Sequence, residues 1–312
     1  MRKPLLCLLL FLFLPAVAFG QAKVGTAGAQ FLEIGVSARA VGMGDAFLAI
    51  SNDASALYYN PAGLVQLEKT ELLASHIEYP ADINYEFLGL AYPSNQLGGV
   101  LGVGFYMLNS GDIPLTTYFY PLDEDPYSSL QTFSAKEYAL ALSYGVSLTD
   151  RFSVGLTFKY IGQSYEKEKA SGWAADIGTL YNTGFRGFKI AMVISNFGPD
   201  LKFIQMEYPL PMNFKFGGSL DIINNGSHKA TFALEGSHPN DNLEKFNGGL
   251  EYWYNDALAL RIGNHFSNDT GGFTAGAGLK MKLSQLNLGF DYAYHDFGYL
   301  NQIHRFSVNV KL

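Results

Sequence analysis

The residues best suited to chemistry in this sequence are its six histidines and a short glycine cluster. A hydrolase needs a serine and a histidine held together by an acid or an amide, and His304 with Ser307 is the nearest such pair. Three residues apart in a strand, these two side chains point to opposite faces. The other candidates have no partner spacing and fall at expected strand ends or loops, so we expect exposed or interfacial side chains: His228, His238, His265 and His295.

Two further signatures are incomplete. No His-x-x-x-His or paired-cysteine spacing indicates a metal site. Gly42-Met43-Gly44 matches the start of a nucleotide-binding motif, but Phe47 stands where the third glycine belongs, and no strand–turn–helix unit surrounds it. We therefore predict a non-enzymatic protein with no catalytic residues, no cofactor and no metal. The glycines are expected to allow close packing instead.

Composition indicates which elements carry these residues. The chain has 312 residues, of which 34 are glycine, 15% are aromatic and only 16% are charged. High glycine and aromatic content without long apolar runs is typical of an all-β protein. The net charge of −7 argues against nucleic acid, which requires a basic face.

The first twenty residues read as a secretory signal peptide. Arg2 and Lys3 precede a short apolar run, and small residues follow it up to Gly20. Removing residues 1–20 also removes Cys7, so the exported chain would have no disulfide framework. Its stability must then come from a large fold of its own.

Strict alternation then dominates the chain. In 151–160, Phe152, Val154, Leu156, Phe158 and Tyr160 share one face, and polar or small residues share the other. Fourteen such segments follow residue 68: 69–79, 83–92, 98–108, 136–148, 151–161, 172–181, 187–196, 212–222, 228–236, 244–254, 257–265, 272–282, 285–294 and 303–312. Their lengths suit tilted membrane strands.

The connections alternate between long and tight. The long ones include 109–135, 162–171, 197–211, 237–243 and 295–302. Outer-membrane barrels have long external loops, short periplasmic turns and an even strand number. The alternative is a soluble β-sandwich, but sandwich strands are usually shorter, and a soluble barrel of this width could not fill its lumen with apolar side chains. We therefore predict a transmembrane antiparallel β-barrel over 69–312, integral to the bacterial outer membrane and surrounded by its lipid.

The two strand faces should respond differently to substitution. The apolar face meets lipid, where an arginine costs roughly 2–4 kcal/mol at the midplane. The other face looks into a polar lumen. We therefore expect Leu156→Arg to be costly and Thr157→Arg to be tolerated.

Residues 21–68 do not alternate and are rich in alanine and glycine. Ser37 is expected to cap a helix that runs toward Ile50, and Asp53 to cap a second one from Ala54 to Tyr58. Asn60-Pro61 stops the second helix. Because a wide barrel leaks unless its lumen is occupied, we predict that 21–68 is a small helical hatch inside it.

This segment resembles a known family. The run Ser37 to Ala46 (SARAVGMGDA), followed by Asn52 to Leu64 (NDASALYYNPAGL), is similar to the hatch of FadL-like outer-membrane barrels, and most similar to their PorV/PorQ branch. The resemblance implies a fourteen-stranded barrel with an N-terminal hatch. The motif residues that it singles out are Arg39, Gly42, Met43, Gly44, Asp45, Asn60, Pro61, Ala62 and Gly63.

The resemblance leaves two functions open. PorV-type members serve type IX secretion, whereas FadL-type members pass hydrophobic compounds inward. Gly63 stands where secretion-linked members carry lysine. The chain is therefore expected to be a hatch-closed barrel in transport or secretion. It would act either as a conduit for hydrophobic small molecules or as a scaffold that engages secreted proteins through its loops.

Two further sets of residues suit these roles. Loop 109–135 carries aromatic residues suited to contact with a partner: Tyr118, Phe119, Tyr120 and Tyr127. The chain ends on alternate apolar residues, like the terminal strand that outer-membrane insertion machinery recognises: Phe306, Val308, Val310 and Leu312. We predict that this end is an assembly signal.

Overall fold

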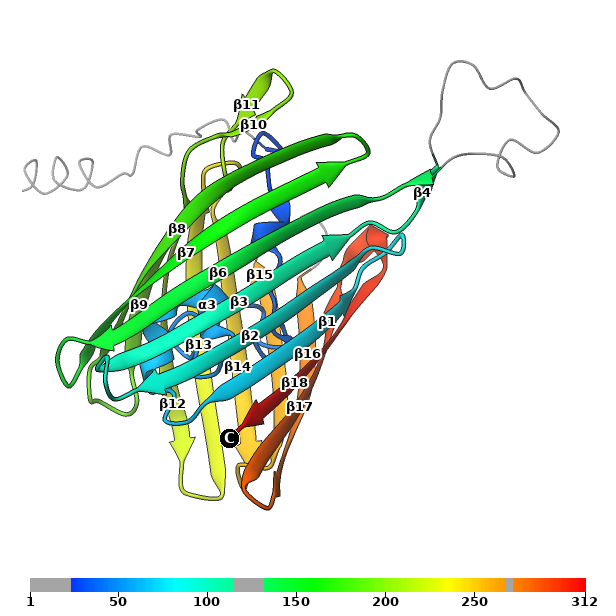
Figure 1. Cartoon of the computed structure of the whole chain (residues 1–312). Coiled ribbons are helices and arrows are strands. Elements are labelled where there is room, and N and C mark those ends of the chain that lie inside the picture. Colours follow the sequence, from blue (N-terminus) through cyan, green and yellow to red (C-terminus); the bar gives the residue numbers. More distant parts are fainter. Residues whose placement is uncertain (1–23, 115–131, 267–271) are drawn as a thin grey trace, which may run out of the picture.

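A computed structural model describes residues 24–114, 132–266 and 272–312. Its main element is a closed barrel of fourteen antiparallel strands, in which every strand pairs with its neighbours along the barrel wall (Figure 1). β1 closes the barrel against β18, with Ser75 opposite Ser307. The predicted fold class, an all-β antiparallel barrel, is confirmed.

The barrel strands lie within one to four residues of the predicted segments at most ends. They are β1 (Glu71–Glu78), β2 (Asn84–Ser94), β3 (Gly99–Asn109), β6 (Ala135–Ser147), β7 (Phe152–Tyr165), β8 (Glu168–Asn182), β9 (Lys189–Phe197), β12 (Asn213–Asn224), β13 (His228–Pro239), β14 (Lys245–Tyr254), β15 (Leu258–Phe266), β16 (Phe273–Leu283), β17 (Leu286–Asp296) and β18 (Gln302–Lys311). The short connections between strands lie at the end of the barrel where β1 begins. Because outer-membrane barrels have short periplasmic turns and longer external loops, this end is the periplasmic one.

One predicted external loop is wrong. Residues 162–171 are not a loop, because β7 and β8 continue as a hairpin to Tyr165 and Glu168, which pair across the turn. Glu166 in this turn has φ +53°. Side chains here are polar on both faces, as expected where a hairpin rises out of the bilayer into water, so hydrophobic alternation no longer marks the strands.

Two of the external connections contain a small two-stranded hairpin. β4 (Ile113–Pro114) pairs with β5 (Thr132–Phe133), and β10 (Leu201–Phe203) pairs with β11 (Met206–Tyr208). Both hairpins lie outside the barrel sheet, within the predicted loops 109–135 and 197–211 (Figure 1).

Residues 24–67, called the lumenal segment below, lie inside the barrel. The segment starts at the external mouth, where Gly28 N donates to Pro209 O at 2.9 Å, and leads down to β1. Its helices are short: η1 (Gln30–Glu33), α2 (Ala38–Val41), α3 (Ala56–Tyr59) and η2 (Pro61–Gln66). A further turn, η3 (Gly298–Leu300), lies in the last external connection.

The long helix expected from Ser37 to Ile50 is wrong. α2 ends at Val41, and Ser37 makes no side-chain cap. Gly44 and Asp45 have φ values of 64° and 56°, a left-handed backbone that cannot continue a helix. The second expectation is closer, since Asp53 accepts from Ser55 N at 3.0 Å just before α3.

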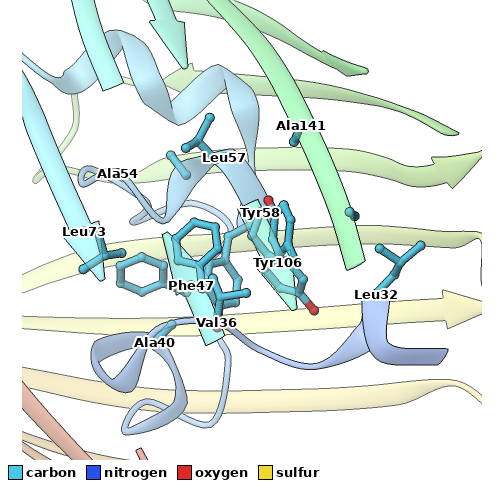
Figure 2. Packing of buried hydrophobic residues seen from close by; sticks show 14 of the residues in the cluster. Leu32, Val36, Ala40, Phe47, Ala54, Leu57, Tyr58, Leu73, Tyr106 and Ala141 are labelled. Atoms are coloured by element: carbon cyan, nitrogen blue, oxygen red, sulfur yellow. The ribbon is translucent and has the colours of Figure 1, made fainter. Parts of the chain in front are cut away.

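The hydrophobic core lies between the lumenal segment and the wall. Tyr59 of the segment forms edge contacts with Phe47 and with Tyr58. Tyr58 also reaches Tyr106 of β3 at a ring distance of 6.3 Å (Figure 2). Leu57 and Ala141 of β6 belong to the same buried cluster (Figure 2). The core of this protein is therefore the lumen itself.

The two faces of each strand follow the predicted alternation. Leu156 is 56% exposed and Thr157 only 2% exposed. The inward face is packed rather than wet, and Thr157 Oγ1 is hydrogen-bonded to Ser143 Oγ at 2.7 Å. The expectation that Thr157→Arg is tolerated is therefore wrong, because an arginine there has no room.

Candidate functional site

The lumenal segment approaches the wall so closely that the wall must be glycine at the contact points. A Cβ on Gly263 would lie 2.1 Å from Gly44 N, and one on Gly155 would lie 2.2 Å from the carbonyl carbon of Pro61. Both distances are far below any van der Waals contact. Gly44 thus lies directly against the backbone of β15, and Pro61 lies directly against the backbone of β7.

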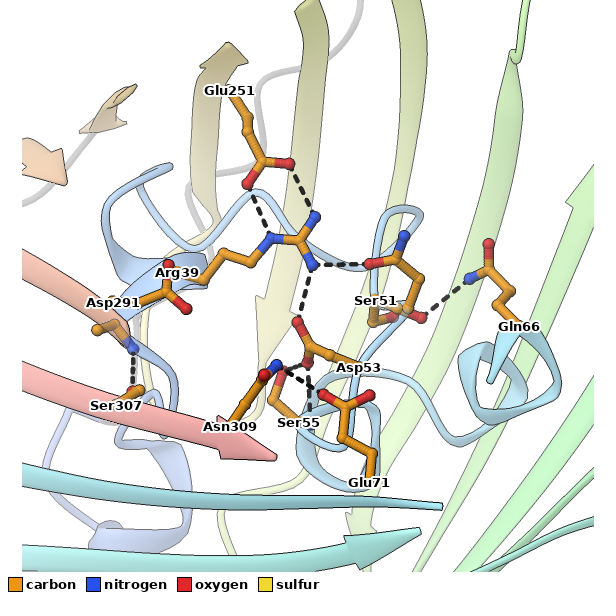
Figure 3. A network of polar contacts seen from close by, with 12 residues as sticks. Arg39, Ser51, Asp53, Ser55, Gln66, Glu71, Glu251, Asp291, Ser307 and Asn309 are labelled. Atoms are coloured by element: carbon orange, nitrogen blue, oxygen red, sulfur yellow. Dashed lines mark hydrogen bonds and ion pairs between the residues drawn. The ribbon is translucent and has the colours of Figure 1, made fainter. Parts of the chain in front are cut away.

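Arg39 joins the segment to the wall through a buried ion-pair network (Figure 3). Its Nε and Nη2 donate to the two carboxylate oxygens of Glu251, each at 2.8 Å, and its Nη1 donates to Asp53 at 2.8 Å. Glu251 also accepts from Arg261 at 2.8 Å, and Arg261 continues to Asp291. Such bidentate pairs are strong and fix orientation.

Burial and charge act in opposite directions on this network. Burial alone would raise the pKa of Asp53, but Arg39 and the Ser55 hydroxyl hold that pKa below its usual range. Burial would likewise lower the pKa of Arg39, and Glu251 and Asp53 raise it instead. Both groups are therefore charged under all ordinary conditions.

Asn60 and Asp45 form two further anchors. The Asn60 amide donates to Leu48 O and to Thr179 O of β8, each at 3.1 Å, while its oxygen accepts from Ala62 N. Asp45 accepts from the Tyr59 hydroxyl at 2.8 Å and faces His265 Nε2 of β15 at 3.2 Å. Burial opposes ionisation of Asp45, but His265, Arg305 and Tyr59 hold its pKa well below the ordinary value.

The remaining motif residues are packing positions. Met43 and Ala62 are fully buried, Gly42 ends α2, and a Cβ on Gly63 would lie 2.2 Å from Ser51 O. The structure thus places all nine motif residues in the lumen. Phe306, Val308 and Leu312 of the C-terminal set face outward, with Val310 partly covered. Tyr118, Phe119, Tyr120, Tyr127 and the signal 1–20 lie outside the described residues.

A cavity of about 310 Å³ lies above the segment, toward the external mouth. Leu32, Glu33, Asp45, Tyr58 and Tyr59 form its floor. The walls come from the external halves of strands on several sides of the barrel, and include Tyr79, Lys159, Lys215, Lys245, His295 and Arg305. The cavity therefore lies between the segment and the wall.

Sequence reasoning missed this cavity. His295, expected to be exposed or interfacial, is 5% exposed and faces the lumen, which corrects that prediction. Its position beside Asp296 at the end of a strand gave no sign of burial, because the burial comes from a remote segment. His304 and Ser307 do point to opposite faces: His304 meets the Tyr292 hydroxyl, whereas the buried Ser307 accepts from Ala38 N at 2.9 Å.

Two kinds of feature are absent from the described residues. None of their helices has the length and apolar character needed to cross a membrane. No group of three or more His, Cys, Asp or Glu side chains among them is placed to hold a metal ion.

A closed fourteen-stranded antiparallel barrel with a chain segment packed in its lumen is the architecture of this protein. The family model of the type IX secretion system protein PorV matches residues 18–238, and the chain belongs to this family. No curated protein matches the chain.

Solved structures agree on the fold. The toluene transporter TbuX of Ralstonia pickettii matches with a TM-score of 0.58 and 13% identity, over 89% of this chain and 97% of that one. The toluene transporter TodX of Pseudomonas putida gives 0.55 and 11%, over 85% and 95%. A FadL homologue of Pseudomonas aeruginosa gives 0.55 and 11%, over 88% and 98%. These likenesses show a shared barrel fold, and membership of the PorV family makes the protein an outer-membrane barrel of transport or secretion.

Proposed function

We propose that the protein is a gated outer-membrane conduit for small amphipathic molecules. In this proposal residues 1–20 are a signal peptide, residues 21–68 are the hatch that occludes the lumen, and residues 69–312 are the barrel. The observation that carries the proposal is the cavity at the external mouth, whose floor is the lumenal segment itself. A ligand from outside would meet a binding site first and a closed path beyond it.

The contacts of the segment favour a hatch that is held closed. Polar anchors reach β8, β14 and β15 through Asn60, Arg39 and Asp45. Wall glycines let its backbone seat directly on β7 and β15. The fold neighbours named as toluene transporters are consistent with passage of small hydrophobic molecules.

Single-channel conductance in a planar bilayer tests the hatch. The intact protein should be nearly closed, and deletion of 25–65 should conduct in large steady steps. Asn60→Ala removes the bonds to Leu48 and Thr179 without emptying the lumen, and should give brief openings. Both variants are first checked as folded barrels by heat-modifiable gel migration. Equal conductance of intact and deleted protein would disprove the occlusion.

One observation favours a second function, a scaffold for secreted proteins. The β10–β11 hairpin stands above the barrel mouth and exposes Ile204, Met206 and Tyr208 (Figure 1). Exposed apolar side chains of this kind suit contact with a protein partner. If the scaffold is the main role, Ile204→Ser with Met206→Ser should reduce secretion of cargo in cells while leaving bilayer conductance unchanged. Normal secretion of cargo by this double variant would count against the scaffold function.

A further inference from the structure

The lipid-facing wall of the barrel contains an apolar groove, called the wall groove below. It has a volume of about 520 Å³ and lies across β12, β13, β14 and β15. The large side chains that line it are exposed on the outer surface of the barrel: Phe216, Phe232, Leu234, Phe246 and Phe266.

Glycines at outward positions make room for the groove. Gly218 of β12 lies opposite Leu234 of β13, and Leu234 lies opposite Gly248 of β14. Gly236 of β13 takes a further outward position, opposite Phe216 on one side and Phe246 on the other. Because these three positions carry no side chain toward lipid, the wall is recessed between the phenylalanine rings.

The polar residues of the groove point to the other side of the wall. Ser219, Glu235 and Asn247 alternate with the outward residues of their strands, so they occupy inward positions. The Glu235 carboxylate accepts from Phe47 N and Leu48 N of the lumenal segment, inside the barrel. The surface that the groove presents to the membrane is therefore apolar.

The shape of the groove limits what can fill it. A recess in an apolar wall loses dispersion contacts unless atoms enter it. A transmembrane helix is about 10–12 Å wide with its side chains, and a second barrel presents a convex wall, so neither enters a recess between neighbouring strands. A hydrocarbon chain is narrow and flexible enough to follow it, and acyl chains surround the barrel in the membrane.

An exposed cation lies near the periplasmic end of the groove. Phe188 lines this end, and its ring lies 3.4 Å from the position that a Cβ on Gly218 would take. Phe188 belongs to the periplasmic turn between β8 and β9, and the same turn exposes Arg186. The Arg186 guanidinium lies over the ring of Phe185, 5.7 Å from its centre.

The turn is held against β12 by its backbone. Arg186 O accepts from Asp221 N at 3.2 Å. The Asp221 carboxylate is occupied by other groups, since it accepts from the Thr231 hydroxyl at 2.8 Å and lies 3.8 Å from Lys229 Nζ. Arg186 forms no ion pair within the described part of the chain, so its charge is available to an anionic group at the membrane surface.

We propose that the wall groove binds an acyl chain of a phospholipid from the periplasmic leaflet of the outer membrane, with the lipid phosphate beside Arg186. The chain packs along the glycines of β12, β13 and β14, between the phenylalanine rings. This inference depends on the barrel and its place in the membrane, and it is independent of the conduit and of the hatch.

Native mass spectrometry of the full-length protein in non-ionic detergent tests the head-group contact. Protein freed of lipid is mixed with dioleoyl-phosphatidylglycerol, or with dioleoylglycerol, which has the same chains and no phosphate. The wild type should retain the phospholipid about threefold better than the neutral lipid, and Arg186→Gln should abolish this difference, because an exposed charge contact is weak. Lys69→Gln changes an exposed cation just before β1 and should behave as the wild type.

Two variants change the groove itself. Gly218→Leu fills it, and Phe232→Ala with Leu234→Ala removes part of its lining, so both variants should lose the bound phospholipid. The matched controls change lipid-facing side chains on other strands in the same two ways: Ala277→Leu on β16, and Leu156→Ala with Phe158→Ala on β7. Both controls should retain the phospholipid as the wild type does. Heat-modifiable gel migration shows that each variant is a folded barrel.

The other outcomes overturn the inference. Absence of a lipid-bound species of the wild type does so, and so does equal retention of phospholipid by the wild type and the folded groove variants. Equal retention of the two lipids by the wild type removes the phosphate contact and with it the assignment to a phospholipid. A dimer that the groove variants abolish would assign the groove to a second copy of the chain. None of these results changes the conductance expected on deletion of 25–65, which tests the hatch alone.

Discussion

A single arginine illustrates how the lumen is organised at the scale of residues. Arg39 lies in the four-residue helix α2. Its side chain forms ion pairs with Glu251 of the wall and with Asp53 of its own segment. Arg261 shares Glu251 and extends the network to Asp291. Each charge has an opposite partner, so the network tolerates burial only while all its members are present.

We predict that Arg39→Leu destabilises the folded barrel by about 3 kcal/mol, because it leaves Asp53 without its cation and Glu251 with one instead of two. The measurement is urea unfolding in detergent. Arg151→Leu is the control, since Arg151 is exposed in a periplasmic turn. Equal midpoints for the two variants would contradict the structural importance of the network.

The glycine contacts support a second prediction. Gly263→Ala places a methyl group 2.1 Å from Gly44 N and must displace the backbone of 42–45, at a cost of about 1–3 kcal/mol. Gly28→Ala meets its nearest atom at an ordinary 3.5 Å and serves as the control. We expect faster proteolysis of the lumenal segment only in Gly263→Ala. If both variants resist protease as the wild type does, the seating is looser than the distances indicate.

The sequence predicted the residues of the segment better than their contacts. The stretch from Arg39 to Asp45 was identified through its family resemblance. The particular partners Glu251 and His265 lie more than 200 residues away from them, and nothing in local spacing indicates such pairs. Arg305 and His295 were missed for the same reason.

At the scale of elements, strands were predictable because one face of each must meet lipid. Contact with lipid requires apolar residues at every second position, as in Phe152 to Tyr160. Outside the bilayer this requirement no longer applies, and alternation no longer predicts the strands. β7 and β8 extend beyond the alternation into a hairpin that is polar on both faces. The helix expected from Ser37 to Ile50 was overestimated, because Gly44 and Asp45 adopt a left-handed backbone that ends it.

The packed lumen changes the mutational asymmetry of β7. Leu156→Arg should cost roughly 2–4 kcal/mol through exposure of a cation to lipid. Thr157→Arg should cost at least as much, through overpacking and loss of the bond to Ser143. Heat-modifiable migration across a temperature series measures both, with Leu156→Ala as the mild control. A stable Thr157→Arg barrel would indicate that the inward face is wetter than its 2% exposure implies.

The final strand has two roles that a truncation can separate. β18 closes the barrel against β1 and also pairs with β17, and its outward residues include Phe306 and Val308. We predict that deleting the last four residues, 309–312, leaves the protein in the periplasm. Fractionation of cells measures this, and refolding of the same variant into detergent is the control. If the variant neither reaches the outer membrane nor refolds in detergent, the closing strand has been lost. If it refolds in detergent but does not reach the outer membrane, the C-terminus is an assembly signal.

At the scale of the whole molecule, the barrel and the segment form one folding unit. The largest hydrophobic cluster mixes residues of the lumenal segment with inward residues of β1, β2, β3 and β6. A cavity remains between the segment and the external halves of the strands, and the segment lines it with residues from Leu32 to Gly35 and with Asp45, Tyr58 and Tyr59. Closure and ligand binding therefore depend on the same contacts.

The acids of the lumenal segment determine how closure responds to pH. Asp45 and Asp53 both have a lowered pKa in the folded protein, despite burial, because of His265 and Arg39 respectively. A carboxyl with a lowered folded pKa contributes stability above its unfolded pKa of about 3.9, and loses it only as the pH falls through the folded value. The pKa of Glu33 shifts in the opposite direction, because burial raises it. Protonation of Glu33 at lower pH therefore removes the free-energy cost of burying its negative charge.

Between pH 7.5 and 4.5, therefore, none of these three acids weakens the seating of the segment, and protonation of Glu33 strengthens it. We predict that the intact protein stays closed in a planar bilayer at both pH values. The variant lacking 25–65 should conduct at both, which shows that acid does not itself block the barrel. Openings of the intact protein that appear at pH 4.5 would contradict this prediction. They would mean that closure depends on titratable groups other than these three acids.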